Sequence, residues 1–400
     1  MFFALTSIFA SDDTLLVSGE RLSGNLLVGT DGWKIDNKIL RAEDVLCIRF
    51  TTGHLPANLD AGVFVRGGSL IAGTLTSVIG ENAEISSTVL GTLKLKRDDI
   101  AGAFTPLPEG QAENMPELAQ YSNLLGSTLG AFGSSLQPGR SCRIRFAGLD
   151  ELHFENIMRI GIEQVLVTTQ DKGVESINRK FMRVIELITP PPPAAPEDKQ
   201  LGPEFIVRLK GGDLLRGRVV KMSEQGMTLR TGFMGEKVIE RVSLAALFSA
   251  GASGSGVTWL STQKPTTAVH TPLFDSVFPA RMDASVNGGE INMNGLSCER
   301  GIGVHSRSQL EFSISGASKR FISVCGIDAE TMGRGEVLAR ILADGREVWK
   351  SAPISGKSQP QLVVVDLGLA SVLRLEVDYG PDEDDSGDHF DWGWAAVVTK

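Results

Sequence analysis

Two short stretches, far apart in the chain, hold the residue types of this sequence that are best suited to chemistry. Gly301–His305 reads Gly-Ile-Gly-Val-His, and Asp388–Trp394 reads Asp-His-Phe-Asp-Trp-Gly-Trp. Together they hold two of the chain's five histidines and two of its five tryptophans. Histidine and aspartate can exchange hydrogen bonds with a ligand, and an indole offers it an apolar face. We expect the two stretches to meet in the fold, with His305 near Asp391.

An acidic run precedes the second stretch, from Tyr379 to Asp388. A structural calcium ion is one interpretation, with Asp384, Asp385 and Asp388 as candidate ligands, because calcium takes carboxylate oxygens. The spacing does not fit an EF-hand loop, so a solvated acidic loop is the favoured alternative. A glycosidase site needs two carboxyl groups that flank the bond to be cut, which carboxylates gathered on one loop do not supply. No other cofactor is expected.

Residues 269–400 must position both stretches, and their pattern is that of a series of strands. Apolar residues either alternate with polar ones, as in half-buried strands, or run almost continuously, as in central strands. Asp344-Gly345 is a strong hairpin signal, and no long helical pattern appears. About eight such strands predict a jelly-roll β-sandwich. The clearest strand patterns fall at Leu310–Ser315, Val337–Leu342, Leu362–Leu367 and Leu373–Asp378.

The ordered motifs of this region resemble the NPCBM family of carbohydrate-binding modules, which are related to galactose-binding-like sandwiches. The resemblance runs from Thr271 to Lys400 and implies glycan binding, with galactose-type sugars as the best-known ligands of close relatives. The matching motifs are, in order, Gly301–Ser308, Phe321–Val324 with Gly326–Asp328, Asp344–Gly345 with Trp349–Ser351, Val365–Leu367, Leu373–Asp378, and Asp388–Trp392 with Ala395.

A sugar site needs an aromatic face for C–H stacking and a few fixed polar groups for the hydroxyls. Structural roles stay open as alternatives. His305 can pin a strand end by hydrogen bonding, and Trp392 alternates with Trp394, so both are expected to face the core from one side of a strand. With the resemblance, the candidate carbohydrate-binding residues are His305, Arg307, Trp349, His389, Asp391 and Trp392.

The first three-fifths of the chain contain an internal repeat. The first glycine of each copy suits a tight hairpin, and the second suits a bulge or sharp bend. In a weaker copy, from Cys142 to Leu187, His153 takes the place of the second glycine and is interpreted as a strand residue. The copies resemble small SH3-like or Sm-like β-barrels, a pattern that implies no function. The glycine pairs are Gly19 and Gly24, Gly68 and Gly73, and Gly212 and Gly217.

The expected fold class is therefore all-β, with several small SH3/Sm-like barrels followed by a jelly-roll, galactose-binding-like sandwich. We expect two repeats over 11–105, a degenerate third over 141–189, a fourth over 204–248 and the sandwich over 269–400. The connections are a linker over 106–140 with a short helix at Asn114–Tyr121, a stiff Pro-rich spacer over 190–203 and a flexible Gly/Ser linker over 249–268. Residues 1–10 are apolar and fit either the end of a secretory signal or a first strand.

Composition narrows the classes of function. The net charge of −9 argues against a nucleic-acid binder, which normally has a basic face. No apolar run reaches the ~18 residues of a membrane span. Cys298 and Cys325 lie in apolar-alternating runs and are interpreted as buried free thiols, with a disulfide as the alternative if the protein is exported.

We expect a non-catalytic glycan-binding protein that works outside the cytoplasm, at the cell surface, in a periplasm or secreted. A glycoside hydrolase that carries the module as an accessory is one alternative, but the sequence has no G-x-S-x-G, H-E-x-x-H or P-loop motif. A structural cell-surface protein is another alternative. The sequence does not predict the oligomeric state.

Overall fold

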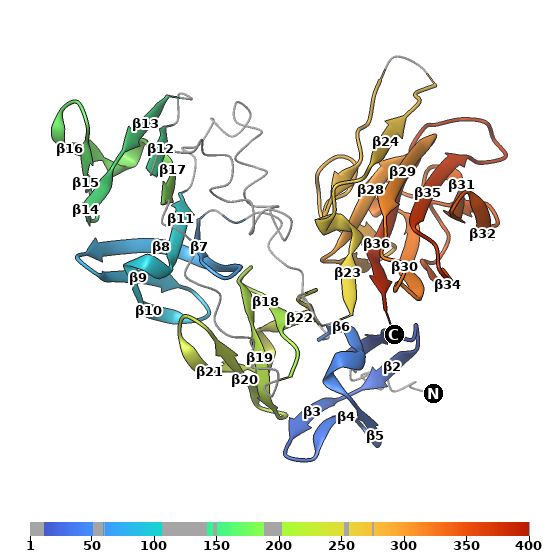
Figure 1. Ribbon diagram of the computed structural model, residues 1–400, viewed down its shortest axis with the longest axis horizontal. Helices are drawn as coiled ribbons and strands as arrows, with labels where there is room; N and C mark the ends of the chain where they lie inside the picture. The colour runs from blue at the N-terminus through green and yellow to red at the C-terminus, as the bar shows by residue number, and fades with distance from the viewer. Residues whose placement is uncertain are drawn as a thin grey trace, which may run out of the picture.

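Figure 1 shows the computed structural model of the protein, which describes residues 12–50, 59, 61–105, 142–146, 150–187, 202–251, 256–273 and 276–399. These residues form strands joined by turns and single 3-10 turns, so the fold is all-β as expected. Residues 1–10, the 106–140 linker with its expected helix, and residues 190–201 of the Pro-rich spacer lie outside the described residues. Within the described part, no helix is long and apolar enough to cross a membrane.

Four repeat units make up the N-terminal part, and we number them 1 to 4 along the chain. Unit 1 contains β1 (Asp12–Leu16), β2 (Arg21–Gly24), β3 (Leu26–Gly29), β4 (Gly32–Ile35), β5 (Lys38–Leu40) and β6 (Val45–Arg49). Unit 2 contains β7 (Gly62–Val65), β8 (Ser69–Ile79), β9 (Asn82–Ser87), β10 (Gly91–Lys96) and β11 (Ile100–Phe104). Unit 3 contains β12 (Cys142–Phe146), β13 (Glu151–Phe154), β14 (Asn156–Ile160), β15 (Gln164–Thr169), β16 (Gly173–Asn178) and β17 (Met182–Leu187). Unit 4 contains β18 (Phe205–Leu209), β19 (Leu214–Met222), β20 (Gly226–Thr231), β21 (Gly235–Glu240) and β22 (Leu244–Ser249).

The second glycine of the repeat lies where two backbones approach closely. A Cβ atom at Gly73 would lie 2.1 Å from the carbonyl oxygen of Ser86, and one at Gly217 would lie 2.4 Å from that of Arg230. Gly73 stands where β8 stops pairing with β7 and begins to pair with β9, so the strand must bend there. In unit 3, with His153 at this place, the long strand is interrupted between β13 and β14.

The four units associate in two pairs. Strand β6 pairs antiparallel with β22, and β11 pairs antiparallel with β17, so units 1 and 4 and units 2 and 3 join through their last strands. Units 2 and 4 meet between β8 and β19. There the Asp213 side chain accepts a hydrogen bond from the backbone N–H of Ala72 (2.9 Å), and Ser69, at the equivalent position of unit 2, accepts one from Arg216 (2.9 Å). This reciprocal pair indicates a pseudo-two-fold relation between the two halves.

The C-terminal part is a sandwich of two antiparallel sheets. One sheet has the order β25-β28-β36-β30-β34 with β23 beside β36, and the other has the order β24-β29-β35-β31-β32 with β33 beside β31. Strands β26 and β27 form a separate hairpin. The bounds are β23 (Val257–Trp259), β24 (Thr267–His270), β25 (Arg281–Met282), β26 (Ile291–Met293), β27 (Leu296–Cys298), β28 (Gly301–His305), β29 (Ser308–Ser313), β30 (Arg320–Ile327), β31 (Glu336–Ala343), β32 (Arg346–Lys350), β33 (Ile354–Ser355), β34 (Gln361–Asp366), β35 (Val372–Tyr379) and β36 (His389–Val398).

The sandwich lies against units 1 and 4 (Figure 1). One apolar cluster holds residues of the sandwich together with residues of all four repeat units. Trp259 packs edge-on against Phe248 of β22, with ring centroids 6.3 Å apart, and its Nε1 donates to the carbonyl oxygen of Ser249 at 2.8 Å. Arg208 of unit 4 forms an ion pair with Glu290 of the sandwich at 3.1 Å.

Strand β23 pairs with the last strand of the sandwich, so the flexible linker expected over 249–268 is wrong from Val257 onward. The strand is only three residues long, too short to give a periodic pattern in the sequence. Cys298 lies in the shared cluster and Cys325 in the sandwich core, and both are buried free thiols in the structure.

Candidate functional site

The two stretches singled out in the sequence are neighbouring strands of one sheet. Strand β28 pairs antiparallel with β36, and this confirms that the stretches meet. His305 lies opposite His389, however, while Asp391 lies opposite Gly303. Gly303 is required by packing, because a Cβ atom there would lie 2.5 Å from the carbonyl oxygen of Ala284. The two imidazoles therefore share one end of the sheet.

A pocket of about 240 Å³ opens at this end, and we call it the histidine pocket. Phe278, from the connection between β24 and β25, stacks on His305 with a centroid distance of 4.3 Å and an interplanar angle of 11°. The rings of His270 and His389 each lie 5.5 Å from His305. Three of the chain's five histidines thus gather at one place. The pocket is lined by Ser276, Phe278, His305, Asp385, Ser386, Gly387 and His389.

His270 holds the aromatic wall of the pocket in place. The backbone N–H of Phe278 donates to its Nδ1 at 3.1 Å, so Nδ1 is an acceptor and the ring proton lies on Nε2. Burial lowers the pKa of His270, which keeps this neutral form. Sequence reasoning missed both residues, because neither belongs to a motif.

His389 is oriented by a carboxylate. Its Nδ1 lies 2.7 Å from Oε1 of Glu330, on the 3-10 turn Ala329–Thr331, and the other oxygen of Glu330 accepts from the Ser285 hydroxyl at 2.9 Å. Burial alone would raise the pKa of Glu330, but hydrogen bonds from His389 and Ser285 outweigh it and lower the pKa. An ionised Glu330 requires the proton of His389 on Nδ1, which leaves Nε2 for a ligand.

His305 forms the floor of the pocket. Burial lowers its pKa from 6.5 to about 4, and the neighbouring rings of His389 and His270 add to that shift. The imidazole is therefore neutral near neutral pH and offers one acceptor nitrogen. The residue is only 3% exposed, so little of it is open to the pocket.

Comparisons with known proteins find a family match in this part of the chain. Residues 256–398 match the family model of the NPCBM/NEW2 domain. The C-terminal sandwich is an NPCBM/NEW2 domain. The chain is also 26% identical over 94 residues to the "Putative endo-alpha-N-acetylgalactosaminidase" of Renibacterium salmoninarum. That stretch is 24% of this chain and 6% of the relative, so the chain spans only a small part of the relative's length.

Two solved structures from Clostridium perfringens are similar. One is the CBM51 module of GH95 in complex with methyl-galactose, at 25% identity and a TM-score of 0.32, over 36% of this chain and 99% of that chain. The other holds the CBM51-2 domain in complex with GlcNAc and the INT domains of ZmpB, at 16% identity and a TM-score of 0.33, over 58% of this chain and 43% of that chain.

Two of the expected binding residues are buried within the NPCBM/NEW2 domain. Trp392 is fully buried between the sheets, and Asp391 is 1% exposed beneath the pocket. Burial raises the pKa of Asp391 well above its usual value, and the adjacent carboxyl of Asp328 raises it further. Both side chains are thus buried in the structure, and their contact with a sugar stays a prediction.

Arg307 and Trp349 lie outside the histidine pocket. Arg307 is exposed in the turn after β28, where its guanidinium lies 5.5 Å from the ring centroid of Tyr379. Trp349, on β32 of the other sheet, is half-buried and packs edge-on against Trp392 at 6.2 Å. Of the six expected residues, the structure brings only His305 and His389 together in the pocket.

The acidic loop of the NPCBM/NEW2 domain does not form a metal site. Oδ1 of Asp384 caps its own loop by accepting from the backbone N–H groups of Asp385 and Ser386. Asp388 is buried, accepts from the N–H of Glu336, and has its pKa raised by burial to about 7. No three acidic, histidine or cysteine residues in the described part are placed to hold a metal ion, so the residues do not fit the calcium interpretation.

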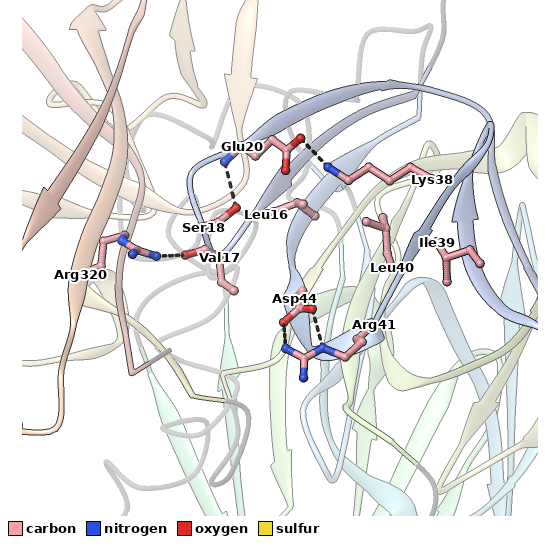
Figure 2. Close-up of a pocket in the computed structure, with 10 residues that line it drawn as sticks. All are labelled: Leu16, Val17, Ser18, Glu20, Lys38, Ile39, Leu40, Arg41, Asp44 and Arg320. Atoms are coloured by element: carbon pink, nitrogen blue, oxygen red, sulfur yellow. Dashed lines mark hydrogen bonds and ion pairs between the residues drawn. The ribbon is translucent and has the colours of Figure 1, made fainter.

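A larger cleft, of about 540 Å³, lies between unit 1 and the NPCBM/NEW2 domain (Figure 2). Its charged groups already have partners: Lys38 pairs with Glu20 at 2.5 Å, and Arg41 pairs with Asp44 at 2.7 Å. Arg320 crosses from the sandwich to donate to the carbonyl oxygen of Val17 at 3.3 Å (Figure 2). The contact of Arg320 with Val17 ties the two parts together, and the other charged groups are paired within unit 1, which makes the histidine pocket the better candidate for a ligand.

Proposed function

We propose that the NPCBM/NEW2 domain binds a glycan in the histidine pocket without cutting it. The observation that carries the proposal is the combination of an aromatic wall, Phe278, with polar groups of His389 and Asp385 around one small hollow. A sugar presents both C–H faces and hydroxyls, and needs both kinds of partner. A pocket of about 240 Å³ suits one terminal sugar residue.

The carboxyl groups around the pocket favour recognition over hydrolysis. Glycoside hydrolysis needs two carboxyl groups on either side of the bond. Among the described lining residues, Asp385 supplies the only carboxylate, because Glu330 lies behind His389 and Asp388 is buried. Galactose-type sugars are the first to test, on the family resemblance.

We further propose that units 1–4 are a platform for the module. The apolar cluster shared by the sandwich and units 1 and 4, with the ion pair of Arg208 and Glu290, supports a fixed attachment. Glycans of this kind occur outside the cytoplasm, so we propose an extracytoplasmic location.

Calorimetric titration of the purified chain with a panel of methyl glycosides tests this function. His389→Ala removes the acceptor that faces the pocket, and Phe278→Ala removes the wall. Each is expected to weaken binding about tenfold or more, as central contacts do. Glu347→Ala, an exposed change on β32, is the matched control and should bind as the wild type does.

Absence of binding to every glycoside in the panel would reject the proposal. Turnover of a chromogenic glycoside by the chain would instead favour the hydrolase alternative. Circular dichroism of each variant separates loss of binding from loss of fold.

A further inference from the structure

Each polar side chain that lines the histidine pocket can accept a hydrogen bond, the hydroxyls of Ser276 and Ser386 included. Asp385 is half-buried, and among the described residues no side chain donates a hydrogen bond to its carboxylate. His389 uses its Nδ1 proton on Glu330, and neutral His305 keeps one unprotonated nitrogen. A ligand that fills this pocket can therefore donate hydrogen bonds to several groups at once.

The formal charge that lines the pocket is negative. Asp385 is the only formally charged lining residue in the described part, and no lysine or arginine lines the pocket. Asp382, Glu383 and Asp384 stand exposed on the same loop. The charge of Asp385 acts within the site, since it opposes the lowering of the His305 pKa. Such a site attracts a cation and repels an anion.

We propose that the pocket selects an amino sugar with a free, protonated amine, an N-unsubstituted hexosamine. The inference rests on the proposed glycan binding. The ammonium group supplies three donors and a positive charge, which match the Asp385 carboxylate and the imidazole acceptors of His305 and His389. Hydroxyls of a neutral sugar can make the hydrogen bonds but not the charge pairing. N-acetylation removes the charge, and a carboxylated sugar reverses it.

Calorimetric titration of the full chain with three methyl glycosides of one hexose frame tests this selection: the neutral hexoside, the N-acetylhexosaminide and the free-amine hexosaminide. The galacto and gluco epimers are both run. The free amine should bind about tenfold more tightly than either of the others at low salt, as expected for a charge-assisted hydrogen bond. The advantage should shrink as salt is added, because Asp385 is partly exposed.

Asp385→Asn should weaken binding of the free-amine glycoside more than binding of the neutral one, and so remove the preference. Asp382→Asn, on the same loop but outside the lining, is the matched control and should keep the preference. Equal affinity of the wild type for the free-amine and neutral glycosides overturns the selection and leaves the proposed function standing. Failure of all glycosides to bind overturns both.

Discussion

His305 and His389 lie opposite each other on paired strands, yet their surroundings give them different roles. His305 is stacked under Phe278 and made neutral by burial, so it shapes the floor of the pocket. His389 is aimed by Glu330 and presents one nitrogen outward. Residue type alone does not distinguish the two, because the difference comes from groups contributed by other segments.

Asp391 makes the stability of the NPCBM/NEW2 domain sensitive to rising pH. Folding raises the pKa of the Asp391 carboxyl above its value in the unfolded chain. The contribution of Asp391 to stability is therefore fully present below the unfolded pKa. It is lost as pH rises, because the carboxyl ionises in the unfolded chain but not in the folded one. Asp391→Asn should remove this loss, which amounts to roughly 1.4 kcal/mol per pH unit.

Thermal unfolding of wild type and variant between about pH 4 and pH 8 measures the effect. The melting temperature of Asp391→Asn should fall less on going to high pH. Glu347→Gln, an exposed change on β32, is the control and should follow the wild type. Parallel curves for Asp391→Asn and the wild type would contradict the prediction.

His305 acts in the opposite direction. Folding lowers the pKa of His305 from 6.5 to about 4. Its contribution to stability is therefore fully present above pH 6.5 and is lost as pH falls toward 4. In that range the imidazole is protonated in the unfolded chain but stays neutral in the folded one. His305→Gln should therefore lose less stability than the wild type on acidification. Urea unfolding at neutral pH and at about pH 4.5 checks this, and an unchanged difference between the two pH values would refute it.

At the scale of elements, single glycines decide where strands bend and how closely they pack. Gly73 and Gly217 allow the long strands of units 2 and 4 to turn from one partner strand to the next. Gly303 allows the chain at Ala284 to lie against β28 beside the pocket. The pattern of glycines therefore reports contacts with backbone, which a Cβ atom would block.

Gly73→Ala should destabilise the chain by about 3 kcal/mol or more, because the new methyl group would lie 2.1 Å from the Ser86 carbonyl oxygen. Gly29→Ala is the matched control, since nothing lies within 4 Å of its Cβ position, and it should change stability by less than about 0.5 kcal/mol. Chemical denaturation of both variants measures the difference. Similar values for the two would show that close approach is not the reason for Gly73.

A bulge in β36 explains an error in the expected packing. Trp392 and Trp394 were predicted on one side of the strand, but the register with β30 shifts between Ile322 and Val324. Trp394 has a positive φ of 49° and belongs to the cluster shared with the repeat units, whereas Trp392 belongs to the sandwich core. Side chains of this one strand are thus buried in two different apolar clusters.

At the scale of the whole molecule, the repeat units and the sandwich share apolar surface and charge pairs. Trp259 and Trp394 are buried where the parts meet, and Arg208 and Glu290 pair across the contact. Burial raises the pKa of Glu290, and Arg208 partly opposes this shift. We expect the parts to unfold together.

Glu290→Arg should weaken this docking by about 2 kcal/mol or more, because it places two positive charges together where Arg208 is largely buried. Calorimetry should then show two unfolding transitions in place of one. Glu347→Arg makes the same charge change on an exposed strand and should leave a single transition. If both variants melt alike, the docking does not depend on this pair.

Much of the fold follows from local sequence alone. Alternating strands, hairpin glycines and the repeat predicted all-β units followed by a sandwich, and the two motifs were correctly expected to meet. These features are local because strand periodicity and positive φ depend on neighbours in the chain.

Only the tertiary structure decided which of those residues line the pocket. Phe278 lines the pocket, and His270 and Glu330 hold the lining residues in place, although none of the three belongs to a motif. Asp391 and Trp392 belong to a motif but are buried. The physical reason is that the side of a strand that is covered depends on what packs on it. Here the other sheet and the Phe278 segment supply that cover, and neither is encoded within the strand itself.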